Sequence, residues 1–264
     1  MKKIYQVDAF TDKPFKGNPA GVMLCDSPLT TELMQDIAME MNISETSFIV
    51  PEKDGFQIRY FTPKKEVYLC GHGTLASAHI IYELGLKKPG ETIFFKATGA
   101  DLTVNMDNGF LAMNFPRYPL KKINTPAAFK AIVGFDPIET YATSYDWIVA
   151  VAASEKDIEL AKPDFEKMLG AELGHLMITA KSNSYQADFV LRCFAPIAGI
   201  NEDPVTGSAH CALTPLWSEK LNKLEMDSLQ LSKRTGKLKT KIVENNRIEI
   251  KGKAITIFEA KIKI

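Results

Sequence analysis

The stretch Cys70-Gly71-His72-Gly73-Thr74 decides how this sequence is interpreted, because it has a counterpart in the second half of the chain. It follows Arg59-Tyr60-Phe61-Thr62-Pro63, and much later the chain runs Arg192-Cys193-Phe194-Ala195-Pro196, the same Arg-x-Phe-x-Pro pattern. Cys70 lies 11 positions after Arg59, and Asp203, which opens Asp203-Pro204-Val205-Thr206-Gly207-Ser208, lies 11 positions after Arg192. Each half therefore has a strand-like run, this marker, a short loop and a small-residue turn that enters a helix. We interpret the pattern as an internal duplication that builds one site from two turns.

The composition is typical of a globular protein and excludes some classes of function. The 264 residues suffice for one large domain or two of ordinary size. Hydrophobic residues make up 45% of the chain and charged residues 24%, so a core can form without disulfides. Lys+Arg and Asp+Glu both number 32, and this zero net charge argues against a dedicated nucleic-acid or membrane surface.

Targeting signals and cysteines indicate the compartment. No apolar segment follows the basic Met1-Lys2-Lys3, and no apolar run reaches the length of a membrane span. The 4 cysteines form no C-x-x-C pair. We therefore expect a cytoplasmic protein with reduced thiols.

Short strands alternate with a few helices along the chain. Apolar periodicity predicts helices at 33–41, 75–84, 127–133, 157–168 and 209–221, with strands between them. Pro163 interrupts the fourth helix, and Pro215 lies inside the fifth, where we expect a kink or an early break. Short turns favour antiparallel strand pairs. The helix after each small-residue turn is apolar on all sides, so a curved sheet around it predicts an α+β architecture.

Each of the two turns has the composition of an anion-binding helix start. A glycine turn at a helix N-terminus presents free backbone N–H groups, and the helix dipole favours a carboxylate or phosphate there. The alternative is ordinary capping, with Thr74 and Ser208 satisfying their own helices. Neither turn is a Walker loop or a dinucleotide-binding fingerprint, because the required Gly-Lys-Ser/Thr and third glycine are missing.

Few residues qualify for proton chemistry. His72 lies between the two glycines of the first turn and titrates near neutral pH, so it can be an acid, a base or a local cap. Asp203 is either a site carboxylate or a helix-dipole partner, and Cys70 is either reactive or simply buried. By composition alone Glu45 faces solvent. We expect structural roles for the remaining candidates, His79, His175, His210 and Cys211, and find no zinc-ligand spacing or nucleophile elbow.

At these residues the sequence resembles the phenazine-biosynthesis-like (PhzF-like) isomerase family, which is related in fold to diaminopimelate epimerase and proline racemase. The opening Val7-Asp8-Ala9-Phe10-Thr11 with Gly17-Asn18-Pro19-Ala20-Gly21 is similar to the signature of the family. Asn42-Ile43-Ser44-Glu45-Thr46 resembles its catalytic-glutamate segment, and the two turns resemble its two site loops. Many members carry alanine at the position of Gly73, a small difference that we expect to leave the chemistry unaltered.

The resemblance implies two similar domains, each a β-sheet rolled into a barrel around a central α-helix, as in diaminopimelate epimerase. These domains would span 1–117 and 125–253, with 254–264 returning to the first and the active site in the cleft between them. It also implies a homodimer without metal or organic cofactor. Glu45 would be the general acid/base, and His72, Asp203 and Ser208 would assist it. The implied substrate-binding residues are Cys70, Gly71, Gly73, Thr74, Thr206 and Gly207.

The expected function is that of a cofactor-independent isomerase that moves a proton on a small carboxylate-bearing metabolite, within a biosynthetic process. One alternative is a catalytically inactive small-molecule binding protein. Another is an amino-acid epimerase that uses Cys70 with a different base. The related epimerases have a cysteine in each turn, whereas the second turn here begins with Asp203, and Cys211 lies about two helical turns further on. This difference argues against a two-thiol racemisation.

Overall fold

The structure is a computed structural model that describes residues 2–264. The chain divides into two compact units, which we describe separately. Unit 1 contains the residues up to Phe115 together with Glu249–Ile264, and unit 2 is Pro116–Ile248. The chain passes from unit 1 to unit 2 after Phe115 and returns to unit 1 after Ile248, within the strand β17 (Arg247–Gly252).

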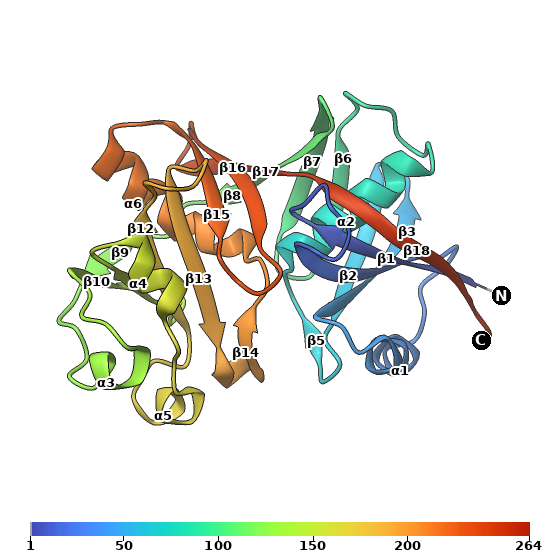
Figure 1. The fold of residues 1–264 in the computed structure, drawn as a ribbon. Helices are drawn as coiled ribbons and strands as arrows, with labels where there is room; N and C mark the ends of the chain where they lie inside the picture. Colours follow the sequence, from blue (N-terminus) through green and yellow to red (C-terminus); the bar gives the residue numbers. More distant parts are fainter. Residues whose placement is uncertain (1) are drawn as a thin grey trace. The chain divides into compact units, whose positions relative to one another are not determined.

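Unit 1 consists mainly of strands around one long helix (Figure 1). Its sheet runs through β18, β1, β2, β3 and β4 and continues through β6, β7 and β8. The pairs β2–β3 and β4–β6 are parallel. The pairs β1–β18, β1–β2, β3–β4, β4–β5, β6–β7 and β7–β8 are antiparallel. The elements are β1 (Lys2–Ala9), β2 (Asn18–Leu24), α1 (Thr31–Met41), β3 (Glu45–Glu52), β4 (Gly55–Phe61), β5 (Glu66–Val67), α2 (Gly71–Glu83), β6 (Ile93–Ala97), β7 (Asp101–Asp107), β8 (Phe110–Pro116) and β18 (Ala254–Ile262).

Unit 2 repeats this strand order, with β10 to β15 in the places of β1 to β6 and β9 in the place of β18. The parallel pairs β11–β12 and β13–β15 correspond to β2–β3 and β4–β6, and β9 pairs with β10 as β18 pairs with β1. The elements are β9 (Leu120–Lys122), α3 (Phe129–Val133), β10 (Glu139–Thr143), β11 (Ile148–Val151), α4 (Glu155–Leu160), α5 (Phe165–Gly170), β12 (Leu176–Lys181), β13 (Phe189–Ala195), η1 (Pro196–Ala198), β14 (Ile200–Asp203), η2 (Gly207–Ala209), α6 (His210–Leu221), β15 (Glu225–Gln230) and β16 (Gly236–Val243). The predicted α+β class and internal duplication are confirmed.

The duplicated helix of unit 1, α2, is buried on nearly all sides because it carries no Lys, Arg, Asp or Glu before Glu83. It lies against β1, β2, β3 and β18. Its end follows the prediction, since Gly85 adopts a φ of 69° just beyond the helix. Among residues 2–264 no helix has the length and apolar character to cross a membrane.

The corresponding helix of unit 2, α6, runs on through Pro215 to Leu221, so an early break is wrong. Pro215 has no N–H, which leaves the carbonyl of Cys211 without its helical partner. The backbone N–H of Tyr118 donates to that carbonyl at 2.9 Å. The proline therefore exposes an acceptor that anchors the segment at the start of unit 2.

The region predicted as one interrupted helix at 157–168 forms two short helices, α4 and α5. Ser154 caps α4 in a capping box with Asp157, and Asp164 caps α5. Pro163 lies between them, where its ring and its missing N–H prevent a continuous helix.

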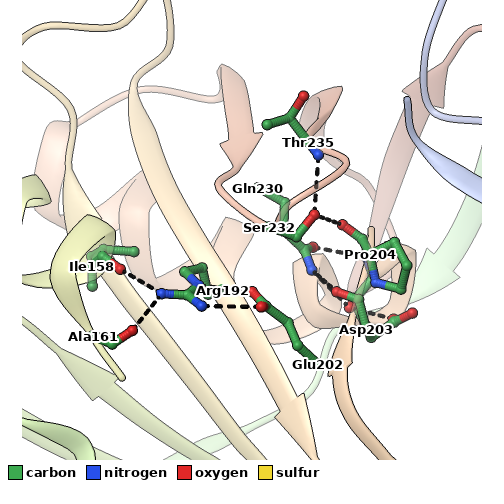
Figure 2. A network of polar contacts seen from close by, with 10 residues as sticks. Ile158, Ala161, Arg192, Glu202, Asp203, Pro204, Gln230, Ser232 and Thr235 are labelled. Carbon is green, nitrogen blue, oxygen red and sulfur yellow. Dashed lines mark hydrogen bonds and ion pairs between the residues drawn. The ribbon is translucent and has the colours of Figure 1, made fainter. Parts of the chain in front are cut away.

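The two Arg-x-Phe-x-Pro markers form matching ion pairs. In unit 1, Arg59 Nε and Nη2 donate to both carboxylate oxygens of Glu66 at 2.7 Å. In unit 2, Arg192 Nε and Nη2 donate to Glu202 at 2.7 and 3.0 Å (Figure 2). Each guanidinium also lies over the ring of the phenylalanine two positions later, at 5.2 Å for Arg59 and 5.0 Å for Arg192. The sequence marker thus fixes the short strands β5 and β14, which lead into the two turns.

Candidate active site

The turn of unit 1 is held by bonds to Cys70, the N-cap residue of α2. Its sulfur accepts the Gly73 N–H at 3.3 Å, and its carbonyl accepts the Thr74 N–H at 3.0 Å and the Thr74 hydroxyl at 2.7 Å. Tyr60 Oη lies 2.6 Å from Thr74 Oγ1 and fixes that hydroxyl from β4. The first helical N–H groups, those of Gly71 and His72, have no carbonyl partner within the helix.

Glu45 begins β3 and points its carboxylate at this turn. Its backbone pairs with Ala20 of the parallel strand β2. Its side chain is only 18% exposed, and Oε2 lies 2.8 Å from His72 Nε2. The solvent-facing position expected from composition is therefore wrong, because His72 and the start of α2 cover the end of the strand.

Charge and burial set the protonation of this cluster. Burial lowers the pKa of His72, but interactions with Cys70 and Glu45 outweigh it, so the pKa of the imidazole lies well above its ordinary value. Burial raises the pKa of the Cys70 thiol, with His72 opposing the shift. The burial of the Cys70 sulfur and its bond to the Gly73 N–H fit a capping role for this residue.

Two residues that the sequence analysis did not assign complete the cluster. Asn18 is fully buried, and its Nδ2 lies 3.3 Å from His72 Nδ1. Ser44 Oγ donates to Asn18 Oδ1 at 3.2 Å. An amide and a hydroxyl can both present donors and acceptors. The contacts from Ser44 through Asn18 to His72 therefore accommodate either protonation state of the imidazole. The only signal in the sequence was their place in the two resembling motifs, since 54 positions separate Asn18 from His72.

Some buried oxygen atoms of the cluster have no hydrogen-bond partner among the described residues. Glu45 Oε2 is one of them, because the 2.8 Å contact with His72 is an ion-pair contact without good hydrogen-bond geometry. Ser47 Oγ, on the same strand, is another. Unpaired buried polar atoms are costly and uncommon, so these oxygens mark a place where a ligand can supply a partner.

Gly73 is more constrained than the resemblance suggested. A Cβ atom built there would lie 2.7 Å from Ser47 Oγ, 3.0 Å from Cys70 Sγ and 3.2 Å from Tyr60 Cδ1. The site therefore packs tightly around glycine at this position.

The chemistry of the cluster also raises the question of a metal. Ligand atoms of Glu45, Cys70 and His72 lie within 4.8 Å of one another. However, Cys70 Sγ lies 3.5 Å from Nδ1 and 3.7 Å from Nε2, so it faces the ring between the two nitrogens. A metal ion bound by both the sulfur and the ring would lie along the lone pair of one ring nitrogen. The sulfur would then lie much farther from the second ring nitrogen than from the first. The arrangement fits proton chemistry better than a shared ion.

The turn of unit 2 is braced by side chains from β15 and the loop after it (Figure 2). Thr206 donates its hydroxyl to Asp203 Oδ2 at 2.5 Å and its backbone N–H to Gln230 Oε1 at 2.8 Å. Gln230 Nε2 donates to the Asp203 carbonyl at 2.7 Å, and Ser232 Oγ donates to the Pro204 carbonyl at 2.6 Å. The Thr206 N–H is therefore already used, which leaves those of Gly207 and Ser208 at the start of η2 for a ligand.

Ser208 and His210 differ in their surroundings. Ser208 is half-buried, and among the described residues its side chain makes no hydrogen bond. His210 is fully buried between the Thr206 carbonyl at 3.1 Å and Ser228 Oγ at 2.7 Å. Burial lowers the pKa of His210 to about 4, so it is neutral and structural, as expected. Among the other expected structural histidines, His175 stacks on Trp147, and His79 contacts Glu83 and Thr256.

The structure thus brings the predicted residues together in two groups. Glu45, Cys70, Gly71, His72, Gly73 and Thr74 meet in unit 1. Asp203, Thr206, Gly207 and Ser208 meet in unit 2.

Known proteins resemble both the sequence and the structure. The family model described as "Phenazine biosynthesis-like protein" matches residues 7–260. An uncharacterized isomerase of Halalkalibacterium halodurans is 40% identical over 98% of this chain and 97% of the relative. Another of Pseudomonas aeruginosa is 39% identical over 99% and 98%. The crystal structure of a PhzF-family phenazine biosynthesis protein of Enterococcus faecalis superposes with a TM-score of 0.94 at 34% identity, covering 100% of this chain and 99% of that one.

The fold and these relatives define the class first: an isomerase of the PhzF-type isomerase and epimerase superfamily. Within it, the chain belongs to the phenazine biosynthesis-like family. The predicted diaminopimelate epimerase-like fold is confirmed by the PhzF structures, and a predicted epimerase of Pseudomonas aeruginosa at 16% identity shares that fold with a TM-score of 0.81.

Proposed function

We propose that the chain is a cofactor-independent isomerase that moves a proton within a small carboxylate-bearing metabolite, with Glu45 as the general acid/base. The observation that carries the proposal is the buried Oε2 of Glu45, which lies 2.8 Å from His72 and has no hydrogen-bond partner among the described residues. A carboxylate in this position can accept a proton from carbon and return it to another carbon as the neutral acid.

The start of α2 supplies the other requirement of such a reaction. Removing a proton next to a carboxylate builds negative charge on the substrate. The N–H groups of Gly71 and His72 and the helix dipole would stabilise that charge, each donor contributing about 3 kcal/mol in a dry site. His72, held by Asn18, would balance the charge of Glu45 as it gains and loses the proton.

The second turn belongs to the same proposal. Its half-buried Ser208, the Gly207 N–H and the Asp203 carboxylate, which Thr206 holds in place, would bind the substrate and assist. We further propose that the protein is a homodimer and that its reaction needs neither a metal nor an organic cofactor. Epimerisation through Cys70 is not favoured, because burial raises the pKa of its thiol and its sulfur already accepts the Gly73 N–H.

Solvent exchange provides the test. We expect the wild-type protein in D2O to incorporate deuterium into a metabolite from a mixture of small carboxylic and amino acids, as detected by mass spectrometry. Glu45→Gln should abolish the incorporation while the same metabolite still binds. Glu52→Gln, at the exposed end of the same strand, is the matched control and should exchange at the wild-type rate.

Two results would count against the assignment. Exchange by Glu45→Gln at the wild-type rate would remove Glu45 from the reaction. Binding of carboxylates by the wild-type protein with no exchange of any substrate proton would favour the alternative of a binding protein.

A further inference from the structure

Unit 2 contains a cavity of about 420 Å³ that has no part in the proposed reaction. It lies where the Arg117–Leu120 segment meets β10 and the second half of α6, and Tyr141 and Leu216 contribute to its lining. Its volume falls in the range of small-molecule sites in proteins, about 300–1,000 Å³.

The walls of the cavity are fixed by bonds within unit 2. The backbone N–H of Tyr118 donates to the Cys211 carbonyl that Pro215 leaves unpaired, and the N–H of Arg117 donates to the Asn246 carbonyl at 3.1 Å. The Tyr118 ring also packs on Tyr145, with 4.3 Å between the centroids. A site built this way is already formed before a ligand arrives, which reduces the entropy cost of binding.

One part of the lining is apolar and suits a ring. Tyr118, Tyr141, Leu120 and Leu216 surround the space together with Pro119 and Pro215. Tyr141 donates its hydroxyl to Glu139 at 3.0 Å, so its polar end is already satisfied. Burial and the neighbouring carboxylates, first Glu139, raise the pKa of Tyr141 to about 12, which keeps the phenol neutral.

Arg117 supplies a positive charge that forms no ion pair with the residues that the structure describes. Its side chain is half-buried, and among the described residues it has no hydrogen bond or ion pair. Arg59 and Arg192, by contrast, each bind a carboxylate through two nitrogens. A partly desolvated guanidinium without a partner favours an anion, and its planar fork matches a carboxylate. Glu219, which also lines the space, disfavours ligands with more than one negative charge.

We propose that this cavity binds a small monocarboxylate with an aromatic or cyclic apolar body, the carboxylate on Arg117 and the ring between Tyr118 and Tyr141. This site is separate in sequence and chemistry from Glu45 and His72. The proposal does not depend on the proposed reaction.

Benzoate is a suitable probe, and benzamide is its neutral isostere. Binding to the wild-type protein would be measured by isothermal titration calorimetry and by saturation-transfer NMR. We expect saturable benzoate binding, and a loss of roughly tenfold or more in Arg117→Gln, the value of one charge-assisted contact. Arg117→Lys should recover part of the affinity because it restores the charge. Benzamide should bind more weakly than benzoate.

Two controls separate this site from the turn of α2. Glu45→Gln and His72→Asn should leave benzoate binding at the cavity unchanged, and Glu219→Gln should leave it unchanged or tighten it. The proposal is overturned if benzoate shows no saturable binding to the wild-type protein, or if Arg117→Gln binds it as tightly as wild type. A benzoate site abolished by His72→Asn and insensitive to Arg117→Gln would assign binding to the α2 turn, which also overturns the cavity proposal and leaves the proposed function standing.

Discussion

Replacing Arg192 with methionine removes a guanidinium that serves three partners in unit 2. Besides its two bonds to Glu202, Arg192 Nη1 donates to the carbonyls of Ile158 and Ala161 at 3.2 and 2.8 Å (Figure 2). These carbonyls lie at the C-terminal end of α4, where they have no helical donor. Methionine preserves much of the volume and loses all of these bonds.

The duplication provides a matched control in Arg59. Its ion pair with Glu66 has the same bidentate geometry, and its ring contact is equivalent. It makes no bond to a helix carbonyl, and its fourth contact is an exposed one to Thr31. Its side chain is also more exposed, 27% against 14% for Arg192.

The magnitudes follow from these differences. A surface ion pair contributes ~0–1 kcal/mol to the free energy of unfolding, and breaking a buried pair costs ~3–5 kcal/mol. A half-buried bidentate pair falls between these values, so we assign about 2 kcal/mol to the ion pair of each arginine. Each helix carbonyl left unpaired adds about 1 kcal/mol. We therefore expect Arg192→Met to lower the free energy of unfolding by about 4 kcal/mol and Arg59→Met by about 2 kcal/mol.

Urea unfolding measures both changes, with far-UV circular dichroism to follow the whole chain. The 2 tryptophans, Trp147 and Trp217, both lie in unit 2, so their fluorescence reports that unit alone. The fluorescence transition should shift strongly in Arg192→Met and little in Arg59→Met. If Arg59→Met were as destabilising as Arg192→Met, the helix carbonyls would contribute nothing and the reasoning would be refuted.

Two further predictions concern histidines. The amide nitrogen of Asn18 lies 3.3 Å from His72 Nδ1, so Asn18→Asp places a carboxylate beside the ring and should raise the pKa of His72 further. NMR titration of the ring measures this pKa, with Ser44→Ala as the control. A pKa equal to or lower than that of the wild-type protein would contradict the contact. For His210, burial holds the pKa of the folded state at about 4, below the unfolded value of about 6.5. Between these pH values the unfolded state binds more protons than the folded state. The stability that is present above pH ~6.5 is therefore lost as the pH falls towards 4. The loss should reach ~3 kcal/mol in urea titrations across this range, and a His210→Asn variant with the same pH slope would show that His210 is not its source.

The duplication was accessible from the sequence because its signals are local. The arginine markers, the glycine turns and the all-apolar helices each occupy a few consecutive residues, and their spacing repeats. The burial of Glu45 was not accessible in this way, because it results from α2 closing over the end of β3. The contact between Asn18 and His72 and the Arg117 cavity likewise depend on which strands pair and how α6 continues through Pro215. Residue patterns predict elements and turns well, while contacts across the chain are set by tertiary packing.

The position of β18 has a consequence for the order in which the protein is made. β1 lies between β2 and β18, and Lys2 of β1 pairs with Ile262 of β18, a residue far away in the sequence. As the chain leaves the ribosome, β1 emerges before the strands of unit 2 and β18 emerges after them, so β1 presents an open edge throughout the synthesis of unit 2. Unit 2 holds its own strands as a continuous segment and can fold before unit 1 is complete. The N-terminal unit is therefore the last to finish, and its open edge is the point at which a nascent chain would need protection from misassembly.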